Sequence, residues 1–173
     1  MGHTPWLDDD EQRTWRAFLA ANRLVSERVE RQMQNESRMP QAYYEILVRL
    51  SEAPGRTLRM SELATSSLSS RSRISHAVAR MEEAGLIART SCPTDRRGQL
   101  AALTDKGMTL LEGAAPGHVR TVRAVMFDAL TREQQHGLRD AAEALVAHLS
   151  DEPLWLVDGE TGDDDPGSGC ATA

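Results

Sequence analysis

Hydroxyl, arginine and imidazole side chains recur on one side of a segment that is amphipathic at helical spacing. Between Ser70 and Met81, the apolar residues at positions 74, 77, 78 and 81 share one face of a helix. The opposite face carries Ser72, Arg73, Ser75, His76 and Arg80. Short hydroxyls permit close approach, and long donors reach base edges or phosphate oxygens. This face predicts contact with a nucleic acid, and a solvated surface helix is the simpler alternative.

A polar run further along the chain offers a second way to contact phosphates or bases. The run Cys92–Gly98 combines a turn-forming proline with the residues that we expect at the tip of a hairpin, Asp95, Arg96, Arg97 and Gly98. An arginine on such a tip can enter a narrow minor groove, where the negative potential is enhanced. Asp95 is close enough in sequence to orient that guanidinium by a charge-assisted hydrogen bond. Alone, the run is better explained as a solvated tip, whereas its combination with the preceding helix favours DNA contact.

Two helices and a turn would position the polar residues between Ser70 and Met81. The stretch Met60–Ala64 gives a short helix one apolar face, and Ser69 or Ser70 caps the longer helix that follows. Gly85 supplies the left-handed residue that ends this second helix.

Two strands would position the polar run Cys92–Gly98. Segments 86–91 and 99–103 are suited to pairing across the polar run. Helix, turn, helix and paired strands over residues 40–103 predict a winged helix-turn-helix, which fits a helix into the major groove and a loop into the minor groove. From the second helix, the residues that we expect to contact DNA are Ser69, Ser70, Arg71, Ser72, Arg73, Ser75, His76 and Arg80.

Long helices are expected before the winged segment. Asp8 and Glu11 have the spacing of a capping box, and apolar residues then recur at helical spacing through 8–35. A second helix opens near Pro40 and leads into the winged segment. The fold class is therefore predicted to be mostly α with a small β wing.

Two further helices are expected over residues 104–150. Thr104 can cap the first of them, which Pro116 should kink or interrupt, and Thr131 begins a capping box for the last. Together with the first helix, they carry more apolar surface than a small winged domain can cover. This surplus predicts antiparallel packing against a second copy of the chain, and packing within a monomer is the alternative.

Charge is distributed unevenly along the chain. The formal net charge is −6, yet residues 151–173 hold seven acidic and no basic side chains. The first 150 residues are therefore net +1, and residues 56–98 hold eight arginines against four acids. Positive charge is concentrated where DNA contact is expected. The acidic tail 151–173 has too little apolar content to form a core and is predicted to be disordered.

Several other classes of protein are disfavoured by the sequence. No run approaches the roughly 20 apolar residues that span a bilayer, and the acidic N-terminus does not have the pattern of an export signal. Cys92 and Cys170 are far apart, which favours a reducing cytoplasm over a disulfide framework or a metal site. No nucleophile elbow, phosphate-binding glycine loop or metal-ligand cluster occurs, so we expect neither an enzyme nor a cofactor.

The segment from about Arg49 to Gly113 resembles the MarR family of bacterial transcriptional regulators. The resemblance is carried by LRMSELA (58–64), SRSRISHAVARMEEAGLI (70–87), CPTDRRG (92–98) and LTDKG (103–107), and most specifically by Asp95 and Arg97. It implies a homodimer in which the first and the last two helices of each subunit interlock. It also implies a palindromic operator, with Arg97 in the minor groove and the helix from Ser70 in the major groove.

The resemblance also suggests how the protein is regulated. Members commonly repress promoters and release DNA when a small, often aromatic molecule enters a cleft beside the dimer helices. Trp15, Tyr43 and Tyr44 are the candidates to line such a cleft, although aromatic residues at helical spacing more often belong to a core. Redox control through Cys92, metal control through histidines, and a winged-helix module that binds protein instead of DNA stay open as alternatives.

Overall fold

A computed structural model of the chain describes residues 5–67, 69–92 and 95–150, without side-chain positions for Arg96 and Arg97. In chain order the elements are α1 (Asp9–Gln32), η1 (Met33–Ser37), α2 (Gln41–Glu52), η2 (Pro54–Arg56), β1 (Thr57–Arg59), α3 (Met60–Ser66), α4 (Arg71–Glu83), β2 (Ile87–Cys92), β3 (Asp95–Leu103), α5 (Asp105–Val122), η3 (Arg123–Phe127) and α6 (Arg132–Leu149). The turns η1 and η3 are π-helical, and η2 is a 3-10 turn. The predicted fold class, mostly α with a small β wing, is confirmed.

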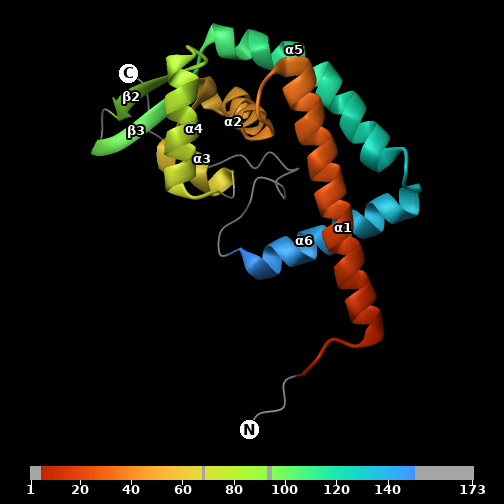
Figure 1. The fold of residues 1–173 in the computed structure, drawn as a ribbon. Helices are drawn as coiled ribbons and strands as arrows, with labels where there is room; N and C mark the ends of the chain where they lie inside the picture. Colours follow the sequence, from red (N-terminus) through yellow and green to blue (C-terminus); the bar gives the residue numbers. More distant parts are fainter. Residues whose placement is uncertain (1–4, 68, 93–94, 151–173) are drawn as a thin grey trace.

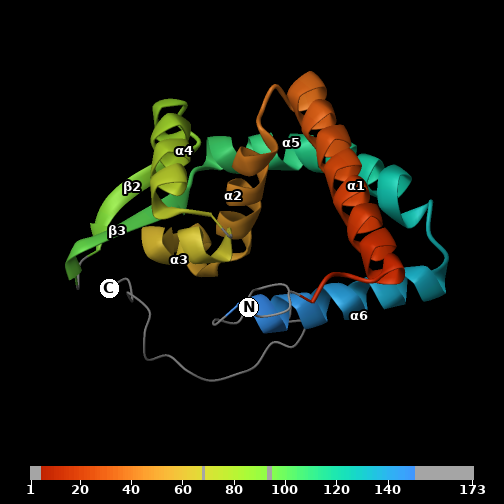
Figure 2. The same ribbon diagram turned by 60° about the horizontal axis from the view of Figure 1, so that its bottom comes forward.

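The elements form two parts that differ in how tightly they pack (Figure 1). The winged part, residues 41–103, gathers α2, α3, α4 and the sheet at one end of the subunit, whereas α1, α5 and α6 extend from it as an open frame. Both views show α6 running from η3 back toward the winged part, so that its C-terminal end lies nearer to α3 than its first turn does (Figures 1 and 2). We refer to α1, α5 and α6 as the helical frame.

The wing is an antiparallel sheet in the order β1-β3-β2. The central strand β3 pairs with β2 from the couple Ile87–Leu103 onward and with β1 from the couple Thr57–Ala102 onward. The strand β1 was not predicted, because three residues are too few to show the alternation by which a strand is recognised in a sequence.

One apolar core joins the winged part to the base of the frame. Its largest fully buried side chains come from η1, α2, α3, α4 and β2, and they are Met33, Leu47, Leu50, Leu63, Val78, Met81 and Ile87. Burial of each such side chain contributes about 1.5–3 kcal/mol. The core therefore holds α4 by its buried face and leaves the opposite face exposed. No helix within the described ranges is long and apolar enough to cross a membrane.

The predicted helix starts are confirmed at side-chain level. Asp8 accepts hydrogen bonds from the amides of the first turn of α1 while Glu11 returns to the amide of Asp8, which completes a capping box. Thr131 and Gln134 form the same arrangement at the start of α6. Thr104 caps α5 by accepting a hydrogen bond from the amide of Gly107.

The interruption predicted at Pro116 is wrong, because α5 is one continuous helix from Asp105 to Val122. The reason lies in the packing of the next residue. Gly117 lies so close to α1 that a Cβ there would meet Nε2 of Gln32 at 2.8 Å. Contact with α1 and η1 along this turn stabilises the helix around the missing N–H of the proline.

Candidate nucleic-acid interface

The helix α4 exposes the polar face that the sequence predicts. Ser70 is its N-cap, with Oγ accepting a hydrogen bond from the amide of Arg73 at 3.3 Å. The exposed residues of the outer face are Arg71, Ser72, Arg73, Ser75, His76 and Arg80. Ser69 precedes the cap and is half-buried, and its amide donates to the carbonyl of Ala64 at 3.2 Å. Ser69 therefore belongs to the turn between α3 and α4, while the remaining candidates share one surface.

Among the described residues, no carboxylate forms an ion pair with the arginines of this outer face. Arg71, Arg73 and Arg80 form no ion pair with any other described residue. A free guanidinium keeps its fork of donors available for phosphate oxygens or for the edge of a guanine. The positive charge of this face therefore favours binding of an anionic ligand.

The C-terminal end of α4 is fastened to the first turn of α5. Gly85, with φ of 72°, takes the left-handed conformation that ends a helix. Thr104 Oγ1 donates to the carbonyl of Gly85 at 2.8 Å, and Lys106 Nζ donates to the carbonyl of Ala84 at 2.6 Å. These bonds satisfy carbonyls that the end of a helix leaves free. The run Leu-Thr-Asp-Lys-Gly thereby ties α4 to the helical frame.

The same joint depends on a close backbone approach at Gly107. A Cβ at this position would collide with the carbonyl oxygen of Leu86 and would lie 2.7 Å from Cδ1 of Leu103. Only a residue without a side chain lets α5 pass this near to the segment that leaves α4.

A carboxylate–guanidinium pair links α4 to the wing. Glu82, in the last turn of α4, accepts hydrogen bonds from Nε of Arg89 at 2.7 Å and from the amide of Arg89 at 3.2 Å. Nη2 of Arg89 lies 2.6 Å from the same carboxylate. The hydrogen bond from the Arg89 side chain lowers the pKa of Glu82 below its usual value of 4.5. This two-pronged contact fixes the angle between α4 and β2.

The run Asp95–Gly98, predicted at the tip of a hairpin, begins directly after the two-residue connection and is part of β3, not of a loop. The strand register shifts here, since Ser91 pairs with Gln99 and Cys92 with Asp95. Strand pairing extends to the couple Cys92–Asp95, so that the two strands are connected by residues 93–94, which lie outside the described residues. Gly98 makes this pairing possible, since a Cβ there would lie 3.0 Å from Oδ2 of Asp95 and 3.1 Å from Cβ of Cys92.

Within the described side chains, Asp95 contacts an arginine of a different strand. Its Oδ2 lies 3.5 Å from Nη1 of Arg59, on β1. The predicted pairing of Asp95 with Arg97, and the roles given to Arg96 and Arg97, concern side chains outside the described set and stay predictions.

Four residues that position this interface were missed in the sequence, namely Arg59, Glu82, Arg89 and Lys106. Each acts across a tertiary contact between separate elements, which no periodicity within one element reveals. The sequence holds a partial indication of the contact between Glu82 and Arg89. These two residues carry opposite charges and lie on either side of the glycine that ends the helix, so they can meet when the chain reverses direction.

The three aromatic residues predicted to line a ligand cleft do not come together within the subunit. Trp15 is exposed on α1 and stacks on Phe18 with ring centroids 6.0 Å apart. Tyr44 is buried, and Tyr43 packs against the same core. The contact between α1 and the start of α2 is made by Glu30, which lies about 22 Å along the helix from Trp15.

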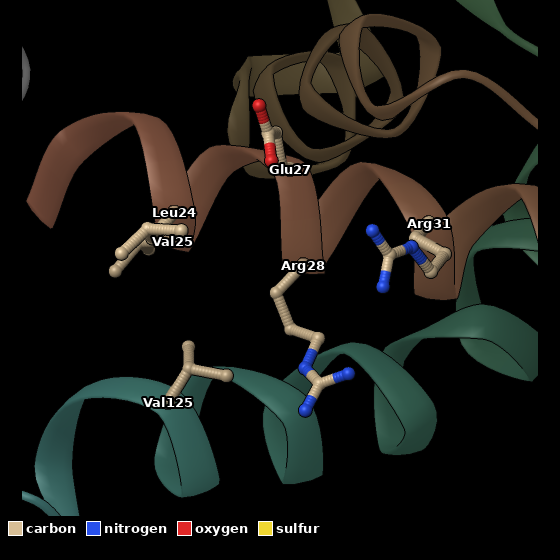
Figure 3. A pocket seen from close by; sticks show the side chains of 6 residues that line it. All are labelled: Leu24, Val25, Glu27, Arg28, Arg31 and Val125. Carbon is tan, nitrogen blue, oxygen red and sulfur yellow. The ribbon is translucent and has the colours of Figure 1, made fainter. Parts of the chain in front are cut away.

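A hollow of about 320 Å³ lies elsewhere, between the second half of α1 and η3 (Figure 3). Its lining residues are Leu24, Val25, Glu27, Arg28, Arg31 and Val125. Figure 3 shows Arg28 reaching from α1 across to the neighbouring helix. The hollow combines apolar carbon with two guanidinium groups and one carboxylate, and none of the predicted aromatic residues lines it.

A half-buried imidazole lies beside the base of the winged part. The rings of His118 and Tyr44 are 4.4 Å apart, and Nδ1 of His118 has no hydrogen-bond partner among the described residues. Burial lowers the pKa of His118 below 6.5, against the opposing effect of Glu45, and burial raises the pKa of Tyr44 above 10.0. No group of three or more metal-ligating side chains occurs among the residues that the structure describes.

Solved structures of similar proteins identify the family. Sco3205, a MarR family transcriptional regulator from Streptomyces coelicolor crystallised in complex with DNA, is 44% identical over 89% of this chain and 96% of its own, with a TM-score of 0.84. AbsC, a MarR family transcriptional regulator from the same organism, is 42% identical over 84% and 98%, with a TM-score of 0.80. A family model described as MarR family matches residues 39–98, and no curated protein matches. The chain belongs to the MarR family of transcriptional regulators.

Proposed function

We propose that the protein binds duplex DNA sequence-specifically as a homodimer and represses transcription at a palindromic operator. The observation that carries this proposal is the outer face of α4, where exposed donors with unpaired positive charge lie beside a wing. The relative Sco3205, 44% identical, was crystallised in complex with DNA. A family of transcriptional regulators is also consistent with a chain that has no catalytic motif.

Each part of the interface has its own role in the proposal. α4 enters the major groove, where Arg73 and His76 read base edges and the nearby serines allow close approach. Arg71 and Arg80 contact phosphates, which position the helix without reading sequence. Arg97 enters the minor groove from the wing. Arg59 and Glu82 hold the wing and α4 in the relative orientation that this requires.

The helical frame supports the proposed homodimer. α6 has no buried described residue, and α1 exposes Trp15, Phe18 and Leu19 at 52%, 45% and 47%. Apolar faces of this extent are stabilised by packing on a second copy. A dimer with two-fold symmetry also presents two α4 helices to the two halves of a palindrome.

Replacement of Arg97 by alanine tests the wing assignment. We expect operator affinity in a fluorescence-anisotropy titration to fall by about tenfold while the dimer stays intact, because a minor-groove arginine contributes roughly 1–3 kcal/mol. Arg13→Ala is the matched control, since Arg13 lies on α1 in an exposed pair with Asp10 and should leave affinity unchanged. Equal affinity of the Arg97→Ala variant and the unmodified protein would contradict the assignment.

Substitutions at Arg73 and His76 test sequence reading by α4. A base contact should change which operator positions are preferred, whereas a phosphate contact at Arg71 or Arg80 should weaken all sequences about equally. Selection of bound duplexes from a randomised pool measures both effects. If Arg73→Ala and His76→Ala leave the preferred sequence unchanged, α4 does not read bases through them.

Release by a small molecule is a further part of the proposal, and the hollow between α1 and η3 is the place we assign to it. Its lining sets the guanidinium groups of Arg28 and Arg31 beside apolar carbon. We expect these two groups to outweigh the single carboxylate of Glu27 and to favour a small aromatic anion. We expect millimolar benzoate to lower operator affinity in the unmodified protein and not in the Arg28→Ala variant. An unchanged titration in the presence of benzoate and of 1-naphthoate would contradict this part.

Simple measurements distinguish this proposal from three alternatives, namely binding of a protein, control by a metal and control by oxidation. A winged module that binds protein would show little dependence on salt, whereas DNA binding weakens steeply as salt rises. Metal control would require the chelator EDTA to change operator affinity. Redox control would require peroxide to reach Cys92, which is only 3% exposed.

A further inference from the structure

The acidic tail 151–173 has no part in the proposed function, yet its charge is opposite to that of the outer face of α4. Its seven acidic residues are Asp151, Glu152, Asp158, Glu160, Asp163, Asp164 and Asp165. We propose that this tail occupies the α4 face of its own chain when DNA is absent, and that it competes with DNA for that face. The inference rests on the proposed function, because the DNA-reading face is the docking surface.

Charge pairing within the winged part singles out α4 as the surface that attracts the tail. Arg56, Arg59 and Arg89 each have a carboxylate partner, at 3.5, 3.5 and 2.6 Å. Arg71, Arg73 and Arg80 have no ion-pair partner among the described residues. A run of carboxylates therefore finds three unsatisfied guanidinium groups on one helix, the same groups that phosphates would meet.

The direction of α6 and the length of the tail make the contact reachable. The C-terminal end of α6 lies on the side of α3 in both views (Figures 1 and 2). Asp163 lies thirteen positions after Ser150. A spacer of that length covers about 20 Å on average without regular structure and roughly 45 Å when extended. A tethered ligand meets its site at an effective concentration on the order of millimolar, so that a weak attraction suffices.

Competition of this kind has a recognisable consequence for DNA binding. The tail acts on the protein and not on the DNA sequence, so it should weaken every duplex by the same factor. It should also lose its effect as salt rises, because the attraction between exposed charges is screened. Occupation of the face would thus lower the affinity for operator and non-operator DNA alike.

Two triple variants of the full-length chain test the proposal. The tail variant carries Asp163→Asn, Asp164→Asn and Asp165→Asn. The control carries Asp9→Asn, Glu112→Gln and Glu133→Gln, three exposed positions on the helical frame, and changes the net charge equally. At about 50 mM salt we expect the tail variant to bind operator and random duplexes roughly three- to tenfold more tightly, and the control to change less than twofold. No gain, or equal gains in both variants, would overturn the proposal.

A spin label locates the tail directly. Cys170 lies in the tail, whereas Cys92 is 3% exposed and protected from thiol reagents. We expect a label on Cys170 to broaden the amide resonances of Ser72, Ser75 and His76 selectively, and operator DNA to reverse the broadening. Uniform or absent broadening would contradict docking on α4. Selective broadening in a protein that binds no duplex would instead overturn the proposed function and leave the docking contact standing.

Discussion

Two amphipathic helices of this subunit, α4 and α6, have different surroundings. α4 buries Ile74, Val78 and Met81, none of which is more than 4% exposed. On α6, by contrast, Leu138, Leu145 and Leu149 are 41%, 50% and 78% exposed. Similar periodicity in the sequence thus leads to a core face in one helix and an open face in the other. The difference lies in the neighbours, since α2, α3 and the sheet surround α4, while α6 stands apart (Figure 2).

This contrast shows that the winged part covers its own apolar side chains within one chain, whereas the helical frame does not. The winged part closes its own core, so that the orientation of α4 is set within one chain by the Glu82–Arg89 pair and by Lys106. The helical frame exposes apolar side chains that one chain cannot cover. In the proposed dimer, the helical frame sets the distance between two winged parts, each of which is folded within its own chain.

Removing the apolar face of α6 should give the largest effect on DNA binding. We expect Leu138→Asp combined with Leu145→Asp to yield a monomer by analytical ultracentrifugation, because two carboxylates would be buried at the interface. Operator affinity should fall by about 100-fold or more, since two linked half-site contacts become independent. The winged part should still unfold cooperatively, because α6 adds no buried described residue to its core.

Glu133→Ala is the control for this variant, as Glu133 is exposed in the first turn of α6. It should remain a dimer with unchanged affinity. A double Leu variant that stays dimeric would show that the exposed face of α6 does not join the subunits.

A matched pair of glycines in α5 probes the joint between the two parts. Gly107→Ala would place a Cβ against the carbonyl oxygen of Leu86, and we expect a loss of about 3 kcal/mol in the free energy of unfolding by urea titration. Gly113→Ala meets nothing within 4 Å and should instead stabilise the helix by about 0.5–1 kcal/mol. Equal results for the two variants would mean that the approach at Gly107 is not a constraint.

Much of the winged part could be predicted because its signals are local. Ser70 as a cap, the buried stripe of α4 and the turn at Gly85 each depend on residues within a few positions of one another. The same holds for the capping boxes at Asp8 and Thr131. Such features follow from backbone groups that must be satisfied wherever a helix begins or ends.

What could not be predicted depends on contacts between distant segments. Pro116 was expected to kink or interrupt a helix, and the helix continues through it where Gly117 packs on α1. Asp95 was expected on a loop, and pairing with Cys92 extends the strand instead. Lys106 reads in the sequence as a surface lysine, yet it satisfies a carbonyl at the end of α4.

The pair Glu82–Arg89 offers a smaller effect that is specific to the winged part. Glu82→Gln should weaken operator binding several-fold while the dimer persists, because the wing is held less firmly against α4. The pKa of Glu82 is lowered in the folded protein, so its contribution to stability is present above the usual value of 4.5 and is lost as the pH falls below it. The stability difference between the two proteins should therefore shrink between about pH 5 and pH 3 in thermal unfolding. A constant difference across this range would contradict the charged contact.

His118 gives the smallest expected effect, at the boundary where α5 packs against α2 of the winged part. Its pKa is lowered by burial beside Tyr44, so the unfolded chain takes up a proton near pH 6.5 while the folded protein still resists it. Stability should consequently be full above pH 6.5 and decline as the pH falls through the lowered folded-state pKa, a change of about 2 °C in the unfolding midpoint. Glu45 opposes the shift and limits its size. His118→Phe keeps a ring against Tyr44, removes the unpaired Nδ1, and should flatten the profile between pH 7.5 and about 5.5. An unmodified protein whose midpoint is already flat over this range would place the imidazole in solvent, and the boundary between the two parts would be looser than the structure shows.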